Sequence, residues 1–113
     1  MYSIHKSDAK LLDLPGRDVN VFVGLDRLKS DFFTVGLTEV PPESSMTPHT
    51  HDDKEEVIFV TEGSGEAVVG GSHEKLEPNT AVVFPIGVEH VVHSTGKNPL
   101  KFVFMFTPPH DFK

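Results

Sequence analysis

The sequence predicts an all-β fold, either a sandwich or a barrel. Short runs of β-branched and aromatic residues alternate with turns rich in glycine, proline and asparagine, a spacing typical of all-β domains. In addition, no stretch keeps the 3.6-residue apolar period of an amphipathic helix. A chain of 113 residues has the length of one domain, so we expect residues 1–113 to form a single unit.

The first third of the chain predicts two longer strands. Residues 1–18 end in the turn signal Leu14-Pro15-Gly16 and indicate a short edge strand or an arm. Residues 19–23 alternate between apolar and polar positions and predict a strand. Residues 32–40 predict a second strand, which stops at Pro41-Pro42 because neither proline can donate to a β-ladder.

The rest of the chain predicts short strands at regular intervals. We expect residues 49–51 to be extended and residues 52–55 to form a polar turn. The strands expected after that turn are Glu56–Val60, Glu66–Val69, His73–Leu76, Ala81–Phe84, His90–Ser94 and Leu100–Thr107. Several of them alternate poorly, which is typical of strands covered on both faces, as when a barrel also packs in a dimer.

Composition excludes several classes of protein. The chain has no cysteine, which excludes disulfides and thiolate metal sites. Its N-terminus lacks the apolar segment of a signal peptide. The longest apolar runs are four or five residues, whereas a membrane helix needs roughly 18, so we expect a cytoplasmic protein with no membrane partner. A net charge of −7 without a Lys/Arg cluster argues against a nucleic-acid surface.

A pair of histidines predicts the centre of the site. Residues i and i+2 of a strand point to the same face, which places His49 and His51 about 7 Å apart along the chain. The polar turn that follows returns the chain beside them and presents a carboxylate. Glu55 and Glu56 compete for this role, and we favour Glu56 because it directly precedes the apolar run. His90 follows the rigid turn Pro85-Ile86-Gly87, which aims it toward the same region.

Three imidazoles and one carboxylate predict a site for one divalent transition metal. Each residue alone is more often a solvated or hydrogen-bonded side chain, and only the pattern as a whole indicates a metal site. Such a ligand set suits Mn, Fe, Co, Ni, Cu or Zn without choosing among them.

The pattern resembles the two motifs of small single-domain cupins. The first motif, G-x5-H-x-H-x(3,4)-E-x6-G, and the second, G-x5-P-x-G-x2-H-x3-N, cover about residues 43–63 and 79–94. The matching positions are His49, His51, Glu56, Gly63, Pro85, Gly87 and His90. Glu43 and Asn79 stand where the motifs open with glycine, and Ser94 stands at the closing asparagine.

The resemblance implies a fold and a ligand set. The fold would be a conical antiparallel β-barrel of the jelly-roll type, also called a double-stranded β-helix, which commonly forms homodimers. The metal ligands would be His49, His51, Glu56 and His90. The chain's end, residues 106–112, is similar to that of small cupins that act on unsaturated uronates, in which a glutamine takes the place of Glu56.

The expected interior is mainly apolar. The side chains expected to face inward are Ile58, Val60, Val82, Phe84, Val92, Phe102, Phe104 and Phe106. Both arginines, Arg17 and Arg27, precede the motifs, so a phosphate clamp is not expected. Strand parity sends His93 outward, and His5, His73 and His110 are expected on the surface. No catalytic residue besides the metal ligands is indicated.

The ligand set favours certain substrates. About two positions on an octahedral ion stay open for a small molecule. A divalent ion with one carboxylate leaves a positive site that favours hydroxy acids, keto acids, catechol-like diols or sugar-like enediolates. The function expected is therefore a small metal-dependent isomerase, oxygenase or lyase that uses Lewis-acid or oxygen chemistry. The alternatives are a ligand-binding or sensor cupin without turnover and, third, a storage or scaffolding protein.

Overall fold

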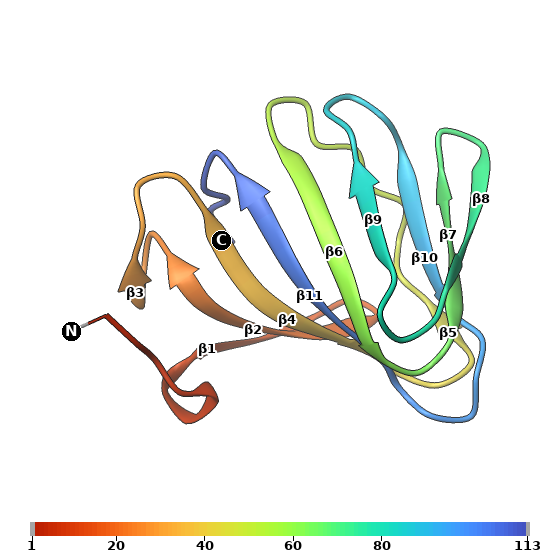
Figure 1. Ribbon diagram of the computed structural model, residues 1–113, viewed down its shortest axis with the longest axis horizontal. Helices are drawn as coiled ribbons and strands as arrows, with labels where there is room; N and C mark the ends of the chain where they lie inside the picture. The colour runs from red at the N-terminus through yellow and green to blue at the C-terminus, as the bar shows by residue number, and fades with distance from the viewer. Residues whose placement is uncertain (1, 113) are drawn as a thin grey trace.

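The computed structural model describes residues 2–112, which form two β-sheets packed face to face (Figure 1). The larger sheet has the order β1 (Lys10–Leu14), β2 (Arg17–Gly24), β4 (Thr34–Val40), β11 (Leu100–Thr107), β6 (Glu55–Glu62) and β9 (Ala81–Phe84), with β3 (Leu28–Lys29) beside β2. The smaller sheet has the order β5 (Ser44–Ser45), β10 (His90–Ser94), β7 (Gly65–Val69) and β8 (Ser72–Leu76). A short 3-10 helix, η1, covers Lys6–Asp8. The predicted all-β jelly roll is confirmed, with its strands arranged as two facing sheets.

Most predicted strands are found with the expected bounds. β9, β10 and β11 begin and end at the predicted residues, and β6 is longer at both ends. The expected edge strand near the N-terminus is β1, which pairs with β2 across the Pro15-Gly16 turn. The sequence did not indicate β3 and β5, because two-residue strands carry no periodic signal.

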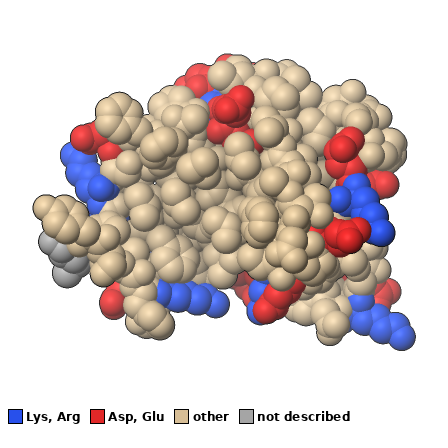
Figure 2. All heavy atoms as spheres, viewed as in Figure 1, with Lys and Arg blue, Asp and Glu red and all other residues tan. Residues whose placement is uncertain are grey.

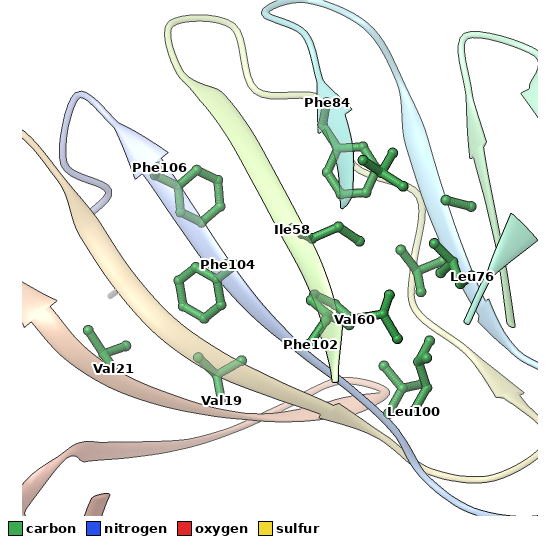
Figure 3. Packing of buried hydrophobic residues seen from close by; sticks show 14 residues of the cluster. Val19, Val21, Ile58, Val60, Leu76, Phe84, Leu100, Phe102, Phe104 and Phe106 are labelled. Carbon is green, nitrogen blue, oxygen red and sulfur yellow. The ribbon is translucent and has the colours of Figure 1, made fainter. Parts of the chain in front are cut away.

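The core lies between the two sheets and follows the alternation of the strands (Figure 3). On β6 the side chains of Glu56, Ile58 and Val60 are buried, while those of Glu55 and Phe59 are exposed. All eight side chains that the sequence places inside are buried: Ile58, Val60, Val82, Phe84, Val92, Phe102, Phe104 and Phe106. Burial of each such side chain contributes about 1.5–3 kcal/mol to folding, which makes this the main source of stability.

A glycine in β4 makes room for one of the core rings. A Cβ on Gly36 would lie 2.5 Å from Cζ of Phe104 and 2.4 Å from the carbonyl oxygen of Asn20. No side chain fits at that distance, so the bare backbone of β4 lets the Phe104 ring lie flat against the sheet.

Two motif positions that depart from glycine still adopt the left-handed conformation. Glu43 has φ 51° and Asn79 has φ 71°. Asparagine adopts this conformation more readily than most residues, and Glu43 accepts the same strained geometry without the short polar side chain that helps asparagine. Both departures therefore preserve the local backbone.

No helix within residues 2–112 combines the length and the apolar character needed to cross a membrane.

Candidate metal centre

A cavity of about 520 Å³ opens between the sheets, with the motif histidines in its wall. Most of the wall is apolar, and its larger side chains are Leu12, Leu14, Met46, Phe102, Phe104 and Phe106. The polar side chains gather around Glu56 and the histidines. The cavity therefore offers an apolar body with one polar end.

Backbone hydrogen bonds tie the two histidine segments together. The His49 amide donates to the His90 carbonyl at 2.8 Å, and the His90 amide donates to the His49 carbonyl at 2.8 Å. The Gly87 amide also donates to the His51 carbonyl at 2.8 Å. Main-chain atoms thus fix the spacing between two segments that are some forty residues apart in the sequence.

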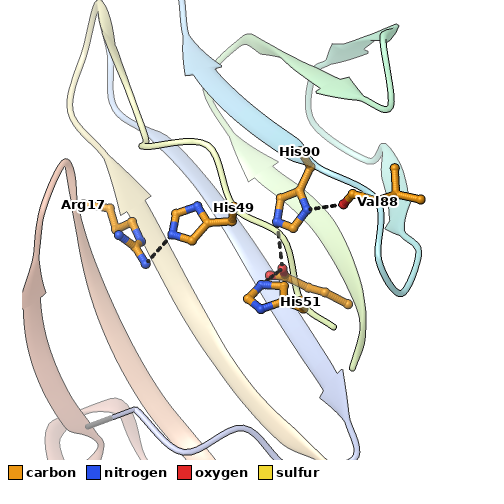
Figure 4. A network of polar contacts seen from close by, with 6 residues as sticks. Arg17, His49, His51, Val88 and His90 are labelled. Atoms are coloured by element: carbon orange, nitrogen blue, oxygen red, sulfur yellow. Dashed lines mark hydrogen bonds and ion pairs between the residues drawn. The ribbon is translucent and has the colours of Figure 1, made fainter. Parts of the chain in front are cut away.

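Three of the four predicted ligands converge on one point (Figure 4). Oε1 of Glu56 lies 3.6 Å from Nε2 of His51 and 3.6 Å from Nε2 of His90. One ligand atom from each residue lies within 4.8 Å of the others. Metal–ligand bonds of about 2.0–2.2 Å hold ligand atoms at most about 4.4 Å apart, so this spacing is close to that of a bound ion.

Aromatic rings hold the imidazoles in place. The ring of Phe84 stacks on His90 with centroids 4.0 Å apart and planes 3° apart. The ring of Phe106 meets His51 edge-on, with centroids 4.9 Å apart. Both phenylalanines are buried, so the ring orientations are set by core packing.

Burial sets the protonation of the site. It lowers the pKa of His90 to about 4, although the hydrogen bond from Nδ1 to the Val88 carbonyl at 3.4 Å acts in the opposite direction. His90 is therefore neutral at pH 7, and its contact with Glu56 is not an ion pair. Because Nδ1–H donates to Val88, the lone pair of Nε2 faces the carboxylate. A metal needs this form of histidine.

The carboxylate of Glu56 is buried beside His90. Burial raises the pKa of Glu56, while a hydrogen bond with His51 and the charge of Arg17 oppose that effect. A divalent cation beside Glu56 would reverse the effect of burial by favouring the ionised form. The neutral imidazole of His90 and the buried carboxylate of Glu56 therefore fit a divalent transition metal. Glu55, the competing carboxylate, is exposed.

His49, the fourth predicted ligand, is close to the other three but faces away. Its ring centroid lies 6.1 Å from that of His51 and 6.0 Å from that of His90. Its Nε2 is 3.4 Å from Nη2 of Arg17 (Figure 4). Burial and the Arg17 charge lower the pKa of His49, and a backbone hydrogen bond with Thr47 opposes them. His49 is thus neutral, with Arg17 in front of the nitrogen that would bind an ion.

The prediction that His110 lies on the surface is wrong. Its ring is half-buried in the cavity wall, stacked on Phe106 with centroids 4.8 Å apart and edge-on to His51 at 5.5 Å. The segment after β11 turns back because the His110 amide donates to Thr34 Oγ1 at 2.9 Å, and that hydroxyl donates to the His110 carbonyl at 3.3 Å. Burial lowers the pKa of His110. In the sequence, Pro108-Pro109 indicated the end of the last strand and gave no sign that the chain turns back into the cavity.

Arg17 is the second residue that sequence reasoning left outside the site. It begins β2 and points inward with the same parity as Val19 and Val21, which are buried. Extending the alternation of residues 19–23 by two residues toward the N-terminus would have placed it in the interior. Two carboxylates that the sequence did not indicate, Asp13 and Asp111, also contribute to the wall and are largely exposed.

The remaining histidines lie where parity and composition place them. His93 lies on the opposite face of β10 from His90, and its Nδ1 is 2.6 Å from the Ser45 hydroxyl. His5 and His73 are exposed.

Comparison with known proteins identifies the family. The family model described as the cupin domain matches residues 36–106. The chain belongs to the cupin domain family. The match spans β4 to β11 apart from the first two residues of β4 and the last residue of β11, and it contains all four predicted ligands.

One curated relative is the tetracenomycin polyketide synthase protein TcmJ of Streptomyces glaucescens. It is 30% identical to this cupin over 74 residues, which cover 66% of this chain and 50% of TcmJ. The chain thus spans about half the length of this relative.

Solved structures agree with the fold. The polyketide cyclase RemF from Streptomyces resistomycificus is 27% identical, with a TM-score of 0.78 over 96% of this chain and 82% of RemF. KdgF from Halomonas sp. has a TM-score of 0.81 over 98% of this chain and 96% of its own, at 20% identity. At that identity KdgF supports the fold alone.

Proposed function

We propose that His49, His51, Glu56 and His90 hold one divalent transition metal (Mn, Fe, Co, Ni, Cu or Zn). Three of these side chains already converge within 4.8 Å. The fourth, His49, is a neutral imidazole whose ring centroid lies 6.0 Å from that of His90. Two backbone hydrogen bonds join His49 to His90. Rotation of the His49 side chain away from Arg17 would add its Nε2 to the cluster.

We infer that this cupin is a small enzyme that acts on an oxygenated small molecule with a largely apolar body. The observation that carries this inference is the cavity of about 520 Å³, whose mainly apolar wall brings the histidine and glutamate cluster together with Arg17, Asp13 and Asp111. A volume of this size suits a small organic ligand. A bound divalent ion would supply Lewis-acid polarisation of a ligand oxygen, or oxygen chemistry.

The chain's own residues define how a ligand lies. Phe84 and Phe106 hold two imidazoles and exclude water from the polar end. Phe102 and Phe104 form an apolar wall in the cavity, which favours a hydroxy or keto compound with an apolar skeleton over a sugar. The 27% identity with a polyketide cyclase and the 30% identity with a polyketide synthase protein support a ligand of this oxygenated type.

The metal site is tested by elemental analysis of untagged protein purified without chelator. We expect near-stoichiometric metal in the wild type and much less in Glu56→Gln, because the amide loses the ligand charge. The matched control is Glu55→Gln, whose side chain is the exposed neighbour. A wild type that neither contains metal nor takes up added metal would refute the proposed centre.

Turnover is tested with the metal-loaded protein on aromatic and aliphatic hydroxy and keto acids, with product detection by mass spectrometry. We expect a product that disappears in His51→Ala while the fold is retained. Metal-dependent thermal shifts without any product would contradict an enzyme and support the ligand-binding alternative.

We further propose a homodimer through the outer face of the larger sheet. Cross-strand pairs form two apolar rows on that face: Leu37, Val103, Phe59 and Ala81, and Val35, Met105, Val57 and Val83. Phe59 and Val83 are 43% and 50% exposed. Figure 2 shows a broad face over β4, β6 and β11 with uncharged side chains at its centre and charged ones along its rim. Such a patch is typical of a protein–protein contact.

The dimer is tested by light scattering coupled to size-exclusion chromatography. Phe59→Ser should shift the wild-type dimer toward monomer. Phe32→Ser, which removes an exposed ring from the loop before β4, is the control and should leave the mass unchanged. A monomeric wild type at micromolar concentration would exclude this interface.

A further inference from the structure

Arg17 is a cation in the wall of the cavity, where the other lining residues combine apolar side chains with the histidines, Glu56, Asp13 and Asp111. It begins β2 and shares the cavity with Leu12, Leu14 and the phenylalanines of β11. Its Nη1 donates to the Pro15 carbonyl at 3.0 Å, and its Nη2 lies 3.4 Å from Nε2 of His49. Both partners are neutral, and one of the contacts is long. The guanidinium thus keeps donor capacity, because it carries five N–H groups.

The environment keeps Arg17 charged. Burial lowers its pKa, and the nearby charge of Glu56 raises it. Arginine starts from such a high value that it stays cationic in proteins. A half-buried cation with neutral partners attracts an anion more strongly than an exposed one would, because water screens it less.

Arg17 also lies close to the candidate metal ligands. His49 separates the guanidinium from His51 and His90, so Arg17 lies one imidazole ring away from the cluster (Figure 4). A small molecule that places one oxygen at the cluster would therefore have a second group within reach of Arg17.

We propose that Arg17 is the anion-binding residue of the cavity and receives the carboxylate of a ligand whose apolar body lies along Phe102 and Phe104. A guanidinium matches a carboxylate through two parallel N–H···O bonds. This inference rests on the proposed function for the metal and specifies the substrate class of the same site. It selects carboxylic acids from among the oxygenated molecules that the cavity accommodates.

The contact with His49 links the two binding events. While Nε2 of His49 accepts from Arg17, it is turned away from the cluster. When His49 turns to an ion, Nη2 of Arg17 loses its acceptor and becomes available to the carboxylate. Because binding linkage is reciprocal, metal and carboxylate strengthen each other's binding.

The test compares two probes of the same shape, 3-phenylpropionate and its neutral amide, by isothermal titration calorimetry. With metal-loaded wild type we expect the carboxylate to bind about tenfold to hundredfold more tightly than the amide. Arg17→Gln should remove this preference while leaving metal content and amide affinity unchanged. Arg27→Gln, which removes a charge from an exposed position between β2 and β3, should keep it.

A second experiment uses protein without metal, so that failure of the proposed metal centre can be distinguished from failure of the Arg17 proposal. In protein stripped of metal and freed of chelator, His49→Ala removes the acceptor that occupies Arg17. This variant should prefer the carboxylate over the amide, and the double variant Arg17→Gln/His49→Ala should not.

Two results would overturn the proposal. One is a carboxylate preference that survives Arg17→Gln, which would assign the anion to the metal alone. The other is binding of the carboxylate no better than the amide by metal-free His49→Ala, including the case in which neither probe binds.

Discussion

The same strands build two ends of the interior that differ in chemistry. At the closed end, Val40, Val60 and Leu100 are 0% exposed and entirely apolar. At the site end, about 13 Å further along β6, the inward position is Glu56, which pairs with Phe106 on one side and Phe84 on the other. Both ends are buried, but only the site end places ionisable groups among aromatic rings.

The groups that stabilise the fold and the groups of the candidate site therefore lie at different ends of the same strands, not in different sheets. The closed end supplies the apolar burial that holds the sheets together. The site end contains a desolvated carboxylate and neutral histidines, which lower stability unless an ion compensates them. Substitutions at the two ends should therefore affect different measurements.

Breaking the closed end should have the largest effect on stability. We expect Leu100→Ala to lower the free energy of unfolding by about 3 kcal/mol, because it leaves a cavity among fully buried side chains. Urea denaturation measures the loss. Metal content at 20 °C should stay unchanged. Val103→Ala, on the outer face of the same strand, should cost less than about 1 kcal/mol. Loss of metal in Leu100→Ala would show that the two ends are coupled.

Adding a side chain at Gly36 should disturb the packing of Phe104, which lies between the closed end and the site end. The new methyl of Gly36→Ala would overlap Phe104 and the neighbouring strand, which should cost about 2 kcal/mol through overpacking. We also expect weaker binding of apolar probes, because the displaced ring lies in the cavity wall. Thermal denaturation and calorimetry measure the two effects. Unchanged stability would mean that β4 relaxes freely.

Acidification should destabilise the site end of the metal-free protein through His90. Its pKa is about 4 in the fold and 6.5 in the unfolded chain, so the unfolded state binds more protons between these values. Stability therefore falls as pH decreases through this window, by about 2 kcal/mol at pH 5 relative to pH 7 and above. Comparing urea denaturation of wild type and His90→Gln isolates this contribution. An identical pH dependence in both proteins would contradict it.

The smallest effect is expected at His110. Its Nδ1 is buried without a hydrogen-bond partner among the described residues. His110→Phe retains the stacking on Phe106 and removes this polar atom, so we expect stability to rise by about 1 kcal/mol. Differential scanning calorimetry measures the change, and metal content is the control. A loss of stability would indicate that the imidazole has a favourable role in the wall.

Local sequence patterns were enough to predict most of the fold. The strands β9, β10 and β11 have the predicted bounds because their alternation and flanking turns agree. Parity also placed His93 on the face opposite His90, and the apolar run after Glu56 favoured this residue over Glu55 as the inward carboxylate. Three of the predicted ligands converge, and assignment of all four to a metal stays a prediction.

The residues that sequence reasoning missed depend on contacts between distant segments. His110 enters the cavity because Thr34, on β4, holds its backbone, and no local pattern records such a contact. Arg17 faces inward through the pairing of β2 with β4. A cation at an inward strand position contradicts the usual composition of a core, so the predicted strand began two residues too late.

The hydrogen bonds that join the His49 and His51 segment to β10 and Gly87 use only main-chain atoms. Among substitutions, only proline at a donor position removes them directly. The cavity lining can therefore diversify through mutation while the histidines keep their spacing, which makes this architecture evolvable. One scaffold of this kind can acquire new ligand preferences by altering a few wall residues, while the backbone spacing of its histidines is inherited unchanged.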